Sequence, residues 1–441
     1  MRKYFGTRSK FWLWVKLKNP ANRASLWALY YFRFMIHIKP FKAIRPPRDK
    51  AYLVATRSYL SYSEEELDEK LDNNPYTFLH VINPTKARSL PFGKEKYEAV
   101  KKCFHKFSDA GVFAQDKKAN YYLYRQQKGA NEYVGLIAAV AVQDYVEGRI
   151  KKHENTLTQR EKMFTDYLET TGFNAEPVLL TYQDDLELNK IFAAYLPTRS
   201  EYEFTSTDKV LHQLWLIEDE AHLSTITDRF SKQEALYIAD GHHRSASSSQ
   251  LAKRIGAEKA GDHQYFMAFL IGEEQMKVYE FNRLIKGSNG KSVPEILAEL
   301  KRNFLVEPKG KEACQPEKLH EISMYIAGNW YKLVPQTGTF DPQDPIGNLD
   351  AEILSQRILD PVLGIKNLKT DKRASFLPGT DGLEGLKNAV DRGEYDVAFA
   401  LYPISVNQIK RVADAQKAMP PKSTYIEPKL RSGLIVYPIG E

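Results

Sequence analysis

A short apolar run, a glycine and a run of small polar residues follow one another near the middle of this chain. The segment reads Ala235-Leu-Tyr-Ile-Ala-Asp-Gly-His-His-Arg-Ser-Ala-Ser-Ser-Ser. The apolar part predicts a buried strand over 235–239, Gly241 predicts a sharp turn, and the residues after it predict a helix over 245–255. This order constrains the fold because it fixes a strand, a turn and a helix start as one unit, with the polar residues at the helix start.

That helix start predicts an anion site. The first amide N–H groups of a helix have no partner within the helix, and the helix dipole favours negative charge there. Arg244 adds a planar guanidinium that suits phosphate oxygens. His242 and His243 are expected to donate hydrogen bonds to phosphate or to transfer protons near neutral pH. We therefore predict that phosphate is bound by Gly241, His242, His243, Arg244 and Ser245.

Two alternatives stay open on these residues alone. The first is a metal site, which is less favoured because the side chains of adjacent histidines diverge and make poor co-ligands for one ion. The second is a structural turn whose histidines cap the helix and bond to the backbone. We expect no protein-held metal site, and we take phosphate binding as the leading hypothesis.

A second candidate segment is Lys151-Lys152-His153-Glu154-Asn155-Thr156. It follows the apolar run at 134–142 and precedes a helix predicted over 157–171, so its side chains are expected at the rim of a site. His153 and Glu154 have the chemistry of an acid, a base or a metal ligand. The alternative is an exposed basic turn without a function.

The third candidate segment is the tail, Met419-Pro-Pro-Lys-Ser-Thr-Tyr-Ile-Glu-Pro-Lys-Leu-Arg-Ser-Gly433. Its prolines exclude a regular helix and stiffen the chain. Its basic and hydroxyl side chains suit an anionic ligand, and they are Lys422, Ser423, Thr424, Lys429 and Arg431. The alternative is a solvated tail, but the apolar residues that follow indicate packing. Weaker signals are Arg125 at a strand end, Asn282-Arg283 and Phe376-Leu-Pro-Gly379.

Charge is distributed unevenly along the 441 residues. Residues 1–34 carry eight basic and no acidic side chains, so a chain of net charge +7 has a body of net charge −1 from Met35 onward. A near-neutral body argues against a nucleic-acid surface. The two cysteines, Cys103 and Cys314, match no zinc or redox spacing, which favours a reducing compartment.

The basic stretch at 1–34 allows three interpretations: an amphipathic membrane anchor, an organellar transit peptide or a misplaced start. We favour a misplaced start, with Met35 as the first natural residue, because the sequence from Met35 reads as the first strand of a domain. No apolar run in this stretch is long enough for a secretory core or a membrane span. We therefore expect a cytoplasmic protein without a membrane or nucleic-acid partner.

The remaining pattern predicts an α+β fold with mixed sheets and flanking helices. Strands are expected at 36–44, 76–82, 119–126, 178–182, 264–271, 276–282, 322–327, 330–334 and 396–402, and helices from Ser63 and at 94–107, 207–229, 293–303, 351–359, 382–392 and 406–415. The strands at 264–271 and 276–282 are expected to pair. Gly287-Ser288-Asn289-Gly290 is linker-like and predicts an N-terminal domain over 35–286 and a smaller α+β domain over 291–441, with the basic tail near the site.

Six spaced motifs together resemble a bacterial family known as domain of unknown function 1015. They are 74–80 (NPYTFLH), 124–126 (YRQ), 153–156 (HENT), 239–244 (ADGHHR), 282–283 (NR) and 419–433. The family is similar to the ParB and sulfiredoxin fold, in which a glycine and a His-Arg pair at a helix start hold nucleotide phosphates. The resemblance runs from about Met35 to the C-terminus and implies a relation to free-serine kinases that use ADP or pyrophosphate.

The resemblance implies a small-molecule phosphotransferase, with free L-serine as acceptor and pyrophosphate or a nucleotide as donor. A carboxylate should orient the acceptor hydroxyl, and Asp240 and Glu154 are both candidates, with His243 as a further catalytic candidate. Arg125, His153 and the five tail residues named above are expected to contact substrate or donor. Mg²⁺ is expected with the phosphate donor.

The oligomeric state stays open. The alternatives are a phosphate-binding regulatory protein and a metal-dependent hydrolase that uses His153, His242, Asp240 and Glu154.

Overall fold

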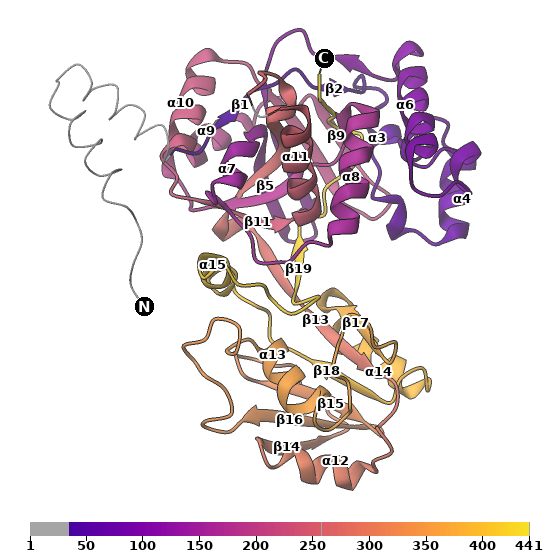
Figure 1. Cartoon of the computed structure of the whole chain (residues 1–441), viewed down its shortest axis with the longest axis vertical. Coiled ribbons are helices and arrows are strands. Elements are labelled where there is room, and N and C mark those ends of the chain that lie inside the picture. The colour runs from indigo at the N-terminus through magenta and orange to yellow at the C-terminus, as the bar shows by residue number, and fades with distance from the viewer. Residues whose placement is uncertain (1–34, 257, 441) are drawn as a thin grey trace, which may run out of the picture.

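The computed structural model describes residues 35–256 and 258–440, which form two α+β lobes of unequal size (Figure 1). The predicted α+β class is confirmed. The interpretations of residues 1–34 lie outside the described residues. Over those same ranges, none of the helices combines the length and the apolar character that crossing a bilayer requires.

The larger lobe is built on a mixed sheet of nine strands. Its strands, in spatial order, are β6 (Ile150–Lys151), β11 (Leu236–Asp240), β8 (Val178–Tyr182), β12 (Tyr265–Gly272), β5 (Asn131–Ala141), β4 (Tyr121–Lys128), β10 (Leu211–Ile217) and β9 (Tyr202–Thr205), with β1 (Ile38–Lys39) paired to β5. The β6–β11 and β8–β12 pairs are parallel and the others are antiparallel. The strand β11, which precedes Gly241, therefore lies next to the edge strand β6.

Both faces of this sheet are covered. One face packs against α7 (Val142–Val146), α9 (Leu186–Tyr195), α10 (Glu220–Ser231) and α11 (His242–Ile255). The other face packs against α3 (Ala51–Val54), α15 (Val406–Asp414) and apolar side chains of the C-terminal tail. Burial on both faces accounts for the nearly continuous apolar character of β5 and β12.

A third layer lies beside the larger lobe. It contains α4 (Glu64–Asn73), and α5 (Leu79–Ile82) and α6 (Lys94–Asp109), which pack around a cluster of phenylalanine rings. It also contains α8 (Thr158–Thr171), which lies between α6 and α11. Ser63 caps α4 with a reciprocal bond to Glu66, at the helix start that the sequence predicts. The short pairs β2 (Ile44–Arg45) with β3 (Ala114–Gln115) and β7 (Phe173–Asn174) with β20 (Tyr437–Pro438) complete this lobe.

The smaller lobe has a seven-stranded sheet. Its order is β14 (Phe304–Gly310), β16 (Asn329–Pro335), β15 (Ile322–Ile326), β18 (Val397–Ala400), β13 (Lys277–Ile285) and β17 (Ala374–Pro378), with β19 (Thr424–Glu427) paired to the first half of β13. One face packs against α12 (Val293–Leu300), α13 (Asp350–Leu354) and the turn at Ser355–Leu359, and the other packs against α14 (Gly382–Asp391).

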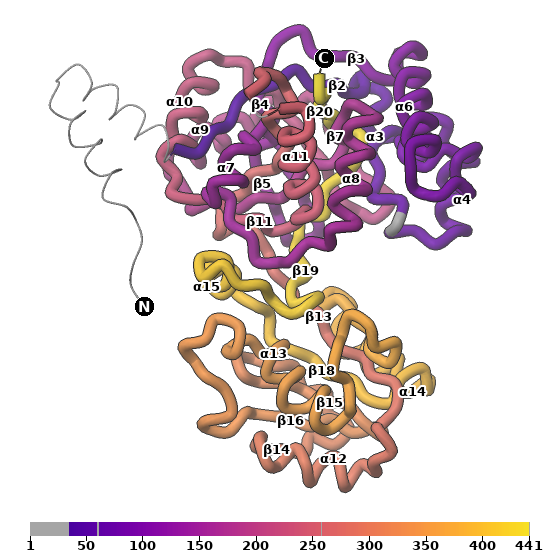
Figure 2. Tube along the Cα trace, in the orientation of Figure 1, coloured from indigo at the N-terminus to yellow at the C-terminus, as the bar shows by residue number. Residues whose placement is uncertain are grey.

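The two lobes are joined by two antiparallel strands. The first half of β13 leads out of the larger lobe, and β19, which follows α15, runs antiparallel beside it (Figure 2). After β19 the tail re-enters the larger lobe, where Val436 pairs with Ile44 and β20 pairs with β7. The linker expected at 287–290 therefore lies inside the smaller lobe, because the preceding strand β13 already belongs to the sheet of that lobe. The C-terminal end of the domain expected over 291–441 packs in the larger lobe.

Three element predictions are wrong. Residues 76–82 form a turn followed by the short helix α5 (Leu79–Ile82) instead of a strand, and Asn74 starts the turn by accepting a hydrogen bond from the amide of Tyr76. The helix expected over 207–229 is the strand β10 followed by α10, since β10 finds partners on both sides in β4 and β9. The strands β12 and β13 do not pair, because each completes a different sheet.

Packing between β5 and β12 provides a test of this core. A Cβ added at Gly135 of β5 would lie 2.5 Å from the Cζ of Phe269 and 2.6 Å from the carbonyl oxygen of Leu270. We expect Gly135→Ala to lower the free energy of unfolding by about 1–3 kcal/mol, because the backbone oxygen cannot move out of the way cheaply. Urea titration measures this. Glu218→Gln, at an exposed position of the same lobe, is the control, and an equal loss in both variants would contradict the packing described.

Candidate functional site

The turn between β11 and α11 forms as the sequence predicts, but the helix starts three residues earlier, at His242. Gly241 has φ 99° and ψ 28°, in the left-handed region that side chains disfavour. A Cβ at this position would also lie 2.9 Å from the Nε of Arg244, whose guanidinium folds over the glycine. The glycine is therefore required both by the backbone conformation and by the packing of Arg244.

The first turn of α11 leaves backbone donors open. Gly241 has no side chain with which to cap the helix, and its carbonyl accepts the amide of Ser245 at 3.0 Å. Within 35–256 and 258–440, no acceptor is found for the amides of His242, His243 and Arg244. Three N–H groups at the positive end of a helix form an anion site.

Arg244 is held by two carboxylates. Its Nη2 donates to Oδ2 of Asp240 at 2.6 Å, and its Nη1 lies 2.6 Å from Oε1 of Glu176. Only 19% of the Arg244 side chain is exposed. The guanidinium that the sequence assigns to phosphate is therefore already engaged, and its charge is balanced within the protein.

Asp240 remains an anion in this arrangement. Burial alone would raise its pKa, but the charges of Arg244, Lys429 and Lys422 outweigh burial and lower the pKa below the ordinary value. The Nζ of Lys429 lies 3.9 Å from Oδ1 of Asp240. A carboxylate that is ion-paired on both oxygens is a weak base.

His153 and His242 form a buried pair. Their rings meet edge to face, with centroids 4.6 Å apart, and the Nε2 of His242 accepts the backbone N–H of His153 at 3.5 Å. Nδ1 is then the protonated nitrogen of His242, and it lies 3.6 Å from Oε2 of Glu154. Burial, together with the charge of His153, lowers the pKa of His242 well below its ordinary value, and burial lowers the pKa of His153 to about 4.

His243 is also neutral at pH 7. The backbone N–H of Leu157 donates to its Nε2 at 3.2 Å, which leaves Nδ1 as the N–H donor. Burial and then the charge of Arg160 lower its pKa. Both rings are therefore held as neutral hydrogen-bonding groups, and their expected role in proton transfer stays a prediction.

Glu154 differs from Asp240 in its partners and in the direction of its pKa shift. Its side chain is 55% exposed, and its contact with His242 is an approach of 3.6 Å. The pKa of Glu154 is raised, first by partial burial between the lobes and then by the charge of Asp240. The positive charges of Lys422, Lys369 and Arg160 act in the opposite direction. The two candidate carboxylates are thus close enough to interact but have opposite pKa shifts.

The tail brings two lysines to this place. The amide of Met419 donates to the carbonyl of His153 at 2.8 Å, which anchors the start of the tail. Lys422 then acts on both Asp240 and Glu154, and Lys429 approaches Asp240. Ser423 donates to the carbonyl of Pro420 at 2.8 Å, and Thr424 begins β19, so both shape the tail.

Two predicted contact residues are engaged elsewhere. Arg431 is buried and pairs with Asp208 at 2.6 Å. Arg125 pairs with Glu132 at 2.5 Å and donates to Gln213 at 2.9 Å. The hydroxyl of Ser245 donates to the carbonyl of Gly241 at 3.3 Å, so it stabilises the turn.

The structure adds Glu176, Lys369 and Arg160 to the residues that the sequence singles out. Glu176 stands in a loop before β8, with no motif around it, and only the tertiary fold brings it to Arg244. A basic residue near the start of α8, such as Arg160, carries no signal in a chain with 63 lysines and arginines.

No three His, Cys, Asp or Glu side chains of the described ranges are arranged to hold a metal ion. Both oxygens of Asp240 face cations, so among the two carboxylates only Glu154 is open to one. A Mg²⁺ ion that fits this place would be coordinated mainly by phosphate oxygens and water, as is common for this ion.

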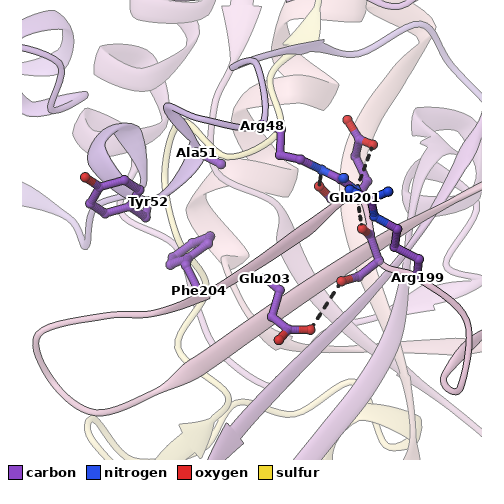
Figure 3. A pocket seen from close by; sticks show the side chains of 8 residues that line it. Arg48, Ala51, Tyr52, Arg199, Glu201, Glu203 and Phe204 are labelled. Carbon is purple, nitrogen blue, oxygen red and sulfur yellow. Dashed lines mark hydrogen bonds and ion pairs between the residues drawn. The ribbon is translucent and has the colours of Figure 1, made fainter.

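A pocket of about 290 Å³ lies elsewhere in the larger lobe (Figure 3). Arg48, Tyr52, Glu201, Glu203 and Phe204 are among its lining side chains, and none of the predicted site residues is. Arg48 faces Glu201 at 3.7 Å and donates to its carbonyl at 2.8 Å. Its charged lining residues are two arginines and two glutamates, so its charges nearly cancel and it offers less to an ionic ligand than the α11 turn.

The comparisons with known proteins identify the family. The model of the family described as "Protein of unknown function (DUF1015)" matches residues 38–352, and the chain belongs to this family. The relation to the ParB and sulfiredoxin fold stays a prediction. The search of curated proteins found no match.

Several solved structures are distantly similar. A free serine kinase variant in complex with AMP shares 13% identity, with 68% of this chain and 91% of that chain covered and a TM-score of 0.34. SbnI with a C-terminal truncation, from Staphylococcus aureus, shares 14% over 68% and 85%, with a TM-score of 0.36. A conserved hypothetical protein from Pyrococcus furiosus shares 14% over 69% and 95%, with a TM-score of 0.32. Likeness at this level carries no argument about activity.

The buried histidines predict a pH dependence of stability. The pKa of His153 is about 4 in the folded chain and near 6.5 when unfolded, so between these values only the unfolded chain binds the proton. Stability from this group is complete above pH 6.5 and is lost as the pH falls towards 4, by up to about 1.4 kcal/mol per pH unit. Urea unfolding at a series of pH values should show a shallower slope for His153→Gln than for the unchanged chain. The exposed His105→Gln is the control, and equal slopes in all three proteins would refute the assignment.

Proposed function

We propose that this protein is a small-molecule phosphotransferase whose donor phosphate binds at the start of α11. The observation that supports this most is the combination of three open amides with a nearby carboxylate of raised pKa, at one turn. Phosphoryl transfer depends mainly on positioning and on electrostatic stabilisation, and both elements are present here.

The phosphate would be bound by neutral N–H donors without an acceptor in the described ranges, together with two lysines of the tail. The amides of His242, His243 and Arg244 and the Nδ1–H of His243 are the neutral donors. Lys422 and Lys429 add positive charge from the tail, and Lys429 is 44% exposed, so it can turn from Asp240 to a ligand. In this proposal Arg244 holds the turn through Asp240 and Glu176 instead of binding the phosphate itself.

Glu154 is the proposed base. As the acceptor oxygen bonds to phosphorus, its proton passes to Glu154, and the bond between phosphorus and the leaving oxygen breaks. The neutral His242 orients Glu154 through Nδ1–H. A carboxylate with a raised pKa accepts a proton more readily than one with a lowered pKa, which favours Glu154 over Asp240 in this role.

The acceptor and the donor follow from the motif resemblance. We propose free L-serine as the acceptor and pyrophosphate, ADP or ATP as the donor, and Mg²⁺ would be expected to bind together with the donor. Mg²⁺ would neutralise charge on the donor and leave the protein residues to position the acceptor and take its proton. A regulatory protein that binds phosphate without turnover is the competing proposal, and the assay below separates the two.

Purified protein with L-serine, Mg²⁺ and each donor in turn should form phosphoserine with at least one donor. Glu154→Gln keeps the size of the side chain and removes the base, so we expect kcat to fall by roughly 10²–10⁴-fold with a smaller change in KM. Glu218→Gln, an exposed residue outside the site, should leave both constants unchanged.

Three outcomes of this assay test the acceptor, the base and the turnover separately. No phosphoserine with any donor would exclude serine as acceptor. Turnover that Glu154→Gln leaves intact would exclude Glu154 as base but keep the transferase. Saturable phosphate binding without turnover of any acceptor would favour the regulatory protein.

A further inference from the structure

Arg283 is an arginine fully enclosed in the smaller lobe, with 0% of its surface exposed. It lies on β13, directly opposite Phe376 of β17 on one side and Phe399 of β18 on the other. Its guanidinium carbon lies 4.7 Å from the centre of the Phe376 ring. The side chain therefore points into an apolar layer of the sheet.

One edge of this guanidinium is satisfied and the other is not. Nη1 donates to the carbonyl of Phe281 at 2.6 Å. Nε and Nη2 are buried, and no acceptor for them is found among residues 35–256 and 258–440. Nε–H and Nη2–H are parallel donors, and this is the edge with which arginine binds two oxygens of a carboxylate or a phosphate.

The charge of Arg283 also has no counterpart. Burial lowers its pKa to about 9, and no carboxylate offsets this. The group thus stays protonated at pH 7. Arg431, which is almost as buried, has Asp208 as its partner. An enclosed cation without an anion is strongly unfavourable, and proteins normally pair it.

We propose that Arg283 is a binding site for a small oxyanion, a carboxylate or a phosphate, held by Nε and Nη2. This site uses none of the backbone donors at the Gly241 turn, although Lys422 approaches both places, and it does not depend on the proposed phosphotransferase activity. The anion would accept hydrogen bonds from the two unpaired donors of Arg283 and would supply the negative charge that balances its guanidinium.

The surroundings indicate how an anion reaches it. Phe376 lies on the edge strand β17 and is partly exposed, and its ring lies against the guanidinium. The ring of Phe376 meets that of Phe281 with centroids 6.4 Å apart, and the Nζ of Lys422 lies 5.1 Å from the centre of the Phe281 ring. In this proposal an anion enters past Phe376, on the side where Lys422 adds positive charge.

The test observes Arg283 directly in the full chain. The ¹⁵Nε–¹Hε NMR signal of Arg283 is assigned as the one that is lost in Arg283→Lys and in Arg283→Met. Sodium phosphate and sodium acetate are then titrated separately into protein in a buffer without other oxyanions. We expect the signal to move and saturate with at least one of the two, and the more effective probe identifies the class of anion.

The variants give a second readout through thermal unfolding. In the absence of oxyanions, Arg283→Met should unfold at the same temperature as the unchanged chain or higher, because it removes an unpaired charge. The effective anion should raise the midpoint of the unchanged chain more than that of Arg283→Met, and Arg283→Lys should bind it roughly tenfold more weakly because the two-oxygen fork is lost. Arg392→Met, at a 66%-exposed arginine of the same lobe, is the control and should behave as the unchanged chain.

A signal of Arg283 that stays in place throughout both titrations would overturn the proposal. So would equal anion-induced stabilisation of Arg283→Met and the unchanged chain. Phosphate binding at the Gly241 turn would persist in every Arg283 variant, so failure of that site and failure of this one give different results.

Discussion

The ion pairs of Arg244 with Asp240 and Glu176 determine how the rest of the site is arranged. They fold the guanidinium over Gly241, which leaves no room for a side chain at the turn. They keep Asp240 ionised, and the negative charge of Asp240 adds to burial, the larger cause, in raising the pKa of Glu154. The ion pairs of Arg244 thus help to separate the pKa values of two carboxylates of similar intrinsic acidity.

Three distant segments converge on this arginine and its turn. They are the loop around His153 and Glu154, the α11 start, and the tail from Met419 to Lys429. The backbone contact between Met419 and His153 joins the first to the third, and the ring contact between His153 and His242 joins the first to the second. The enclosed histidines contribute because they are neutral, since uncharged rings can pack closely beside lysines and arginines without repulsion.

The sequence predicts the local parts of this structure well and the long-range parts poorly. The strand–glycine–helix unit, the capped helix at Ser63 and the helices at 94–107 and 157–171 follow from apolar spacing and turn chemistry, and they are present. The pairing of β12 and β13 was expected from their proximity in sequence, but the choice of strand partner depends on the whole sheet. Likewise, Glu154 and Lys422 could be named from their motifs, whereas Glu176 could not, because nothing near it in the chain marks its contact with Arg244. The engagement of Arg431 by Asp208 could not be predicted for the same reason.

The larger lobe is formed by two separate parts of the chain, which lie before and after the smaller lobe. Residues of the tail supply part of the apolar layer on one face of the large sheet, and β20 pairs with β7. The family model ends at residue 352, before this tail begins. In topological terms the smaller lobe is an insertion within the larger one, entered through β13 and left after β18, because α15 already packs on the large sheet. The larger lobe is therefore a discontinuous unit that closes only when the last residues of the chain have been added.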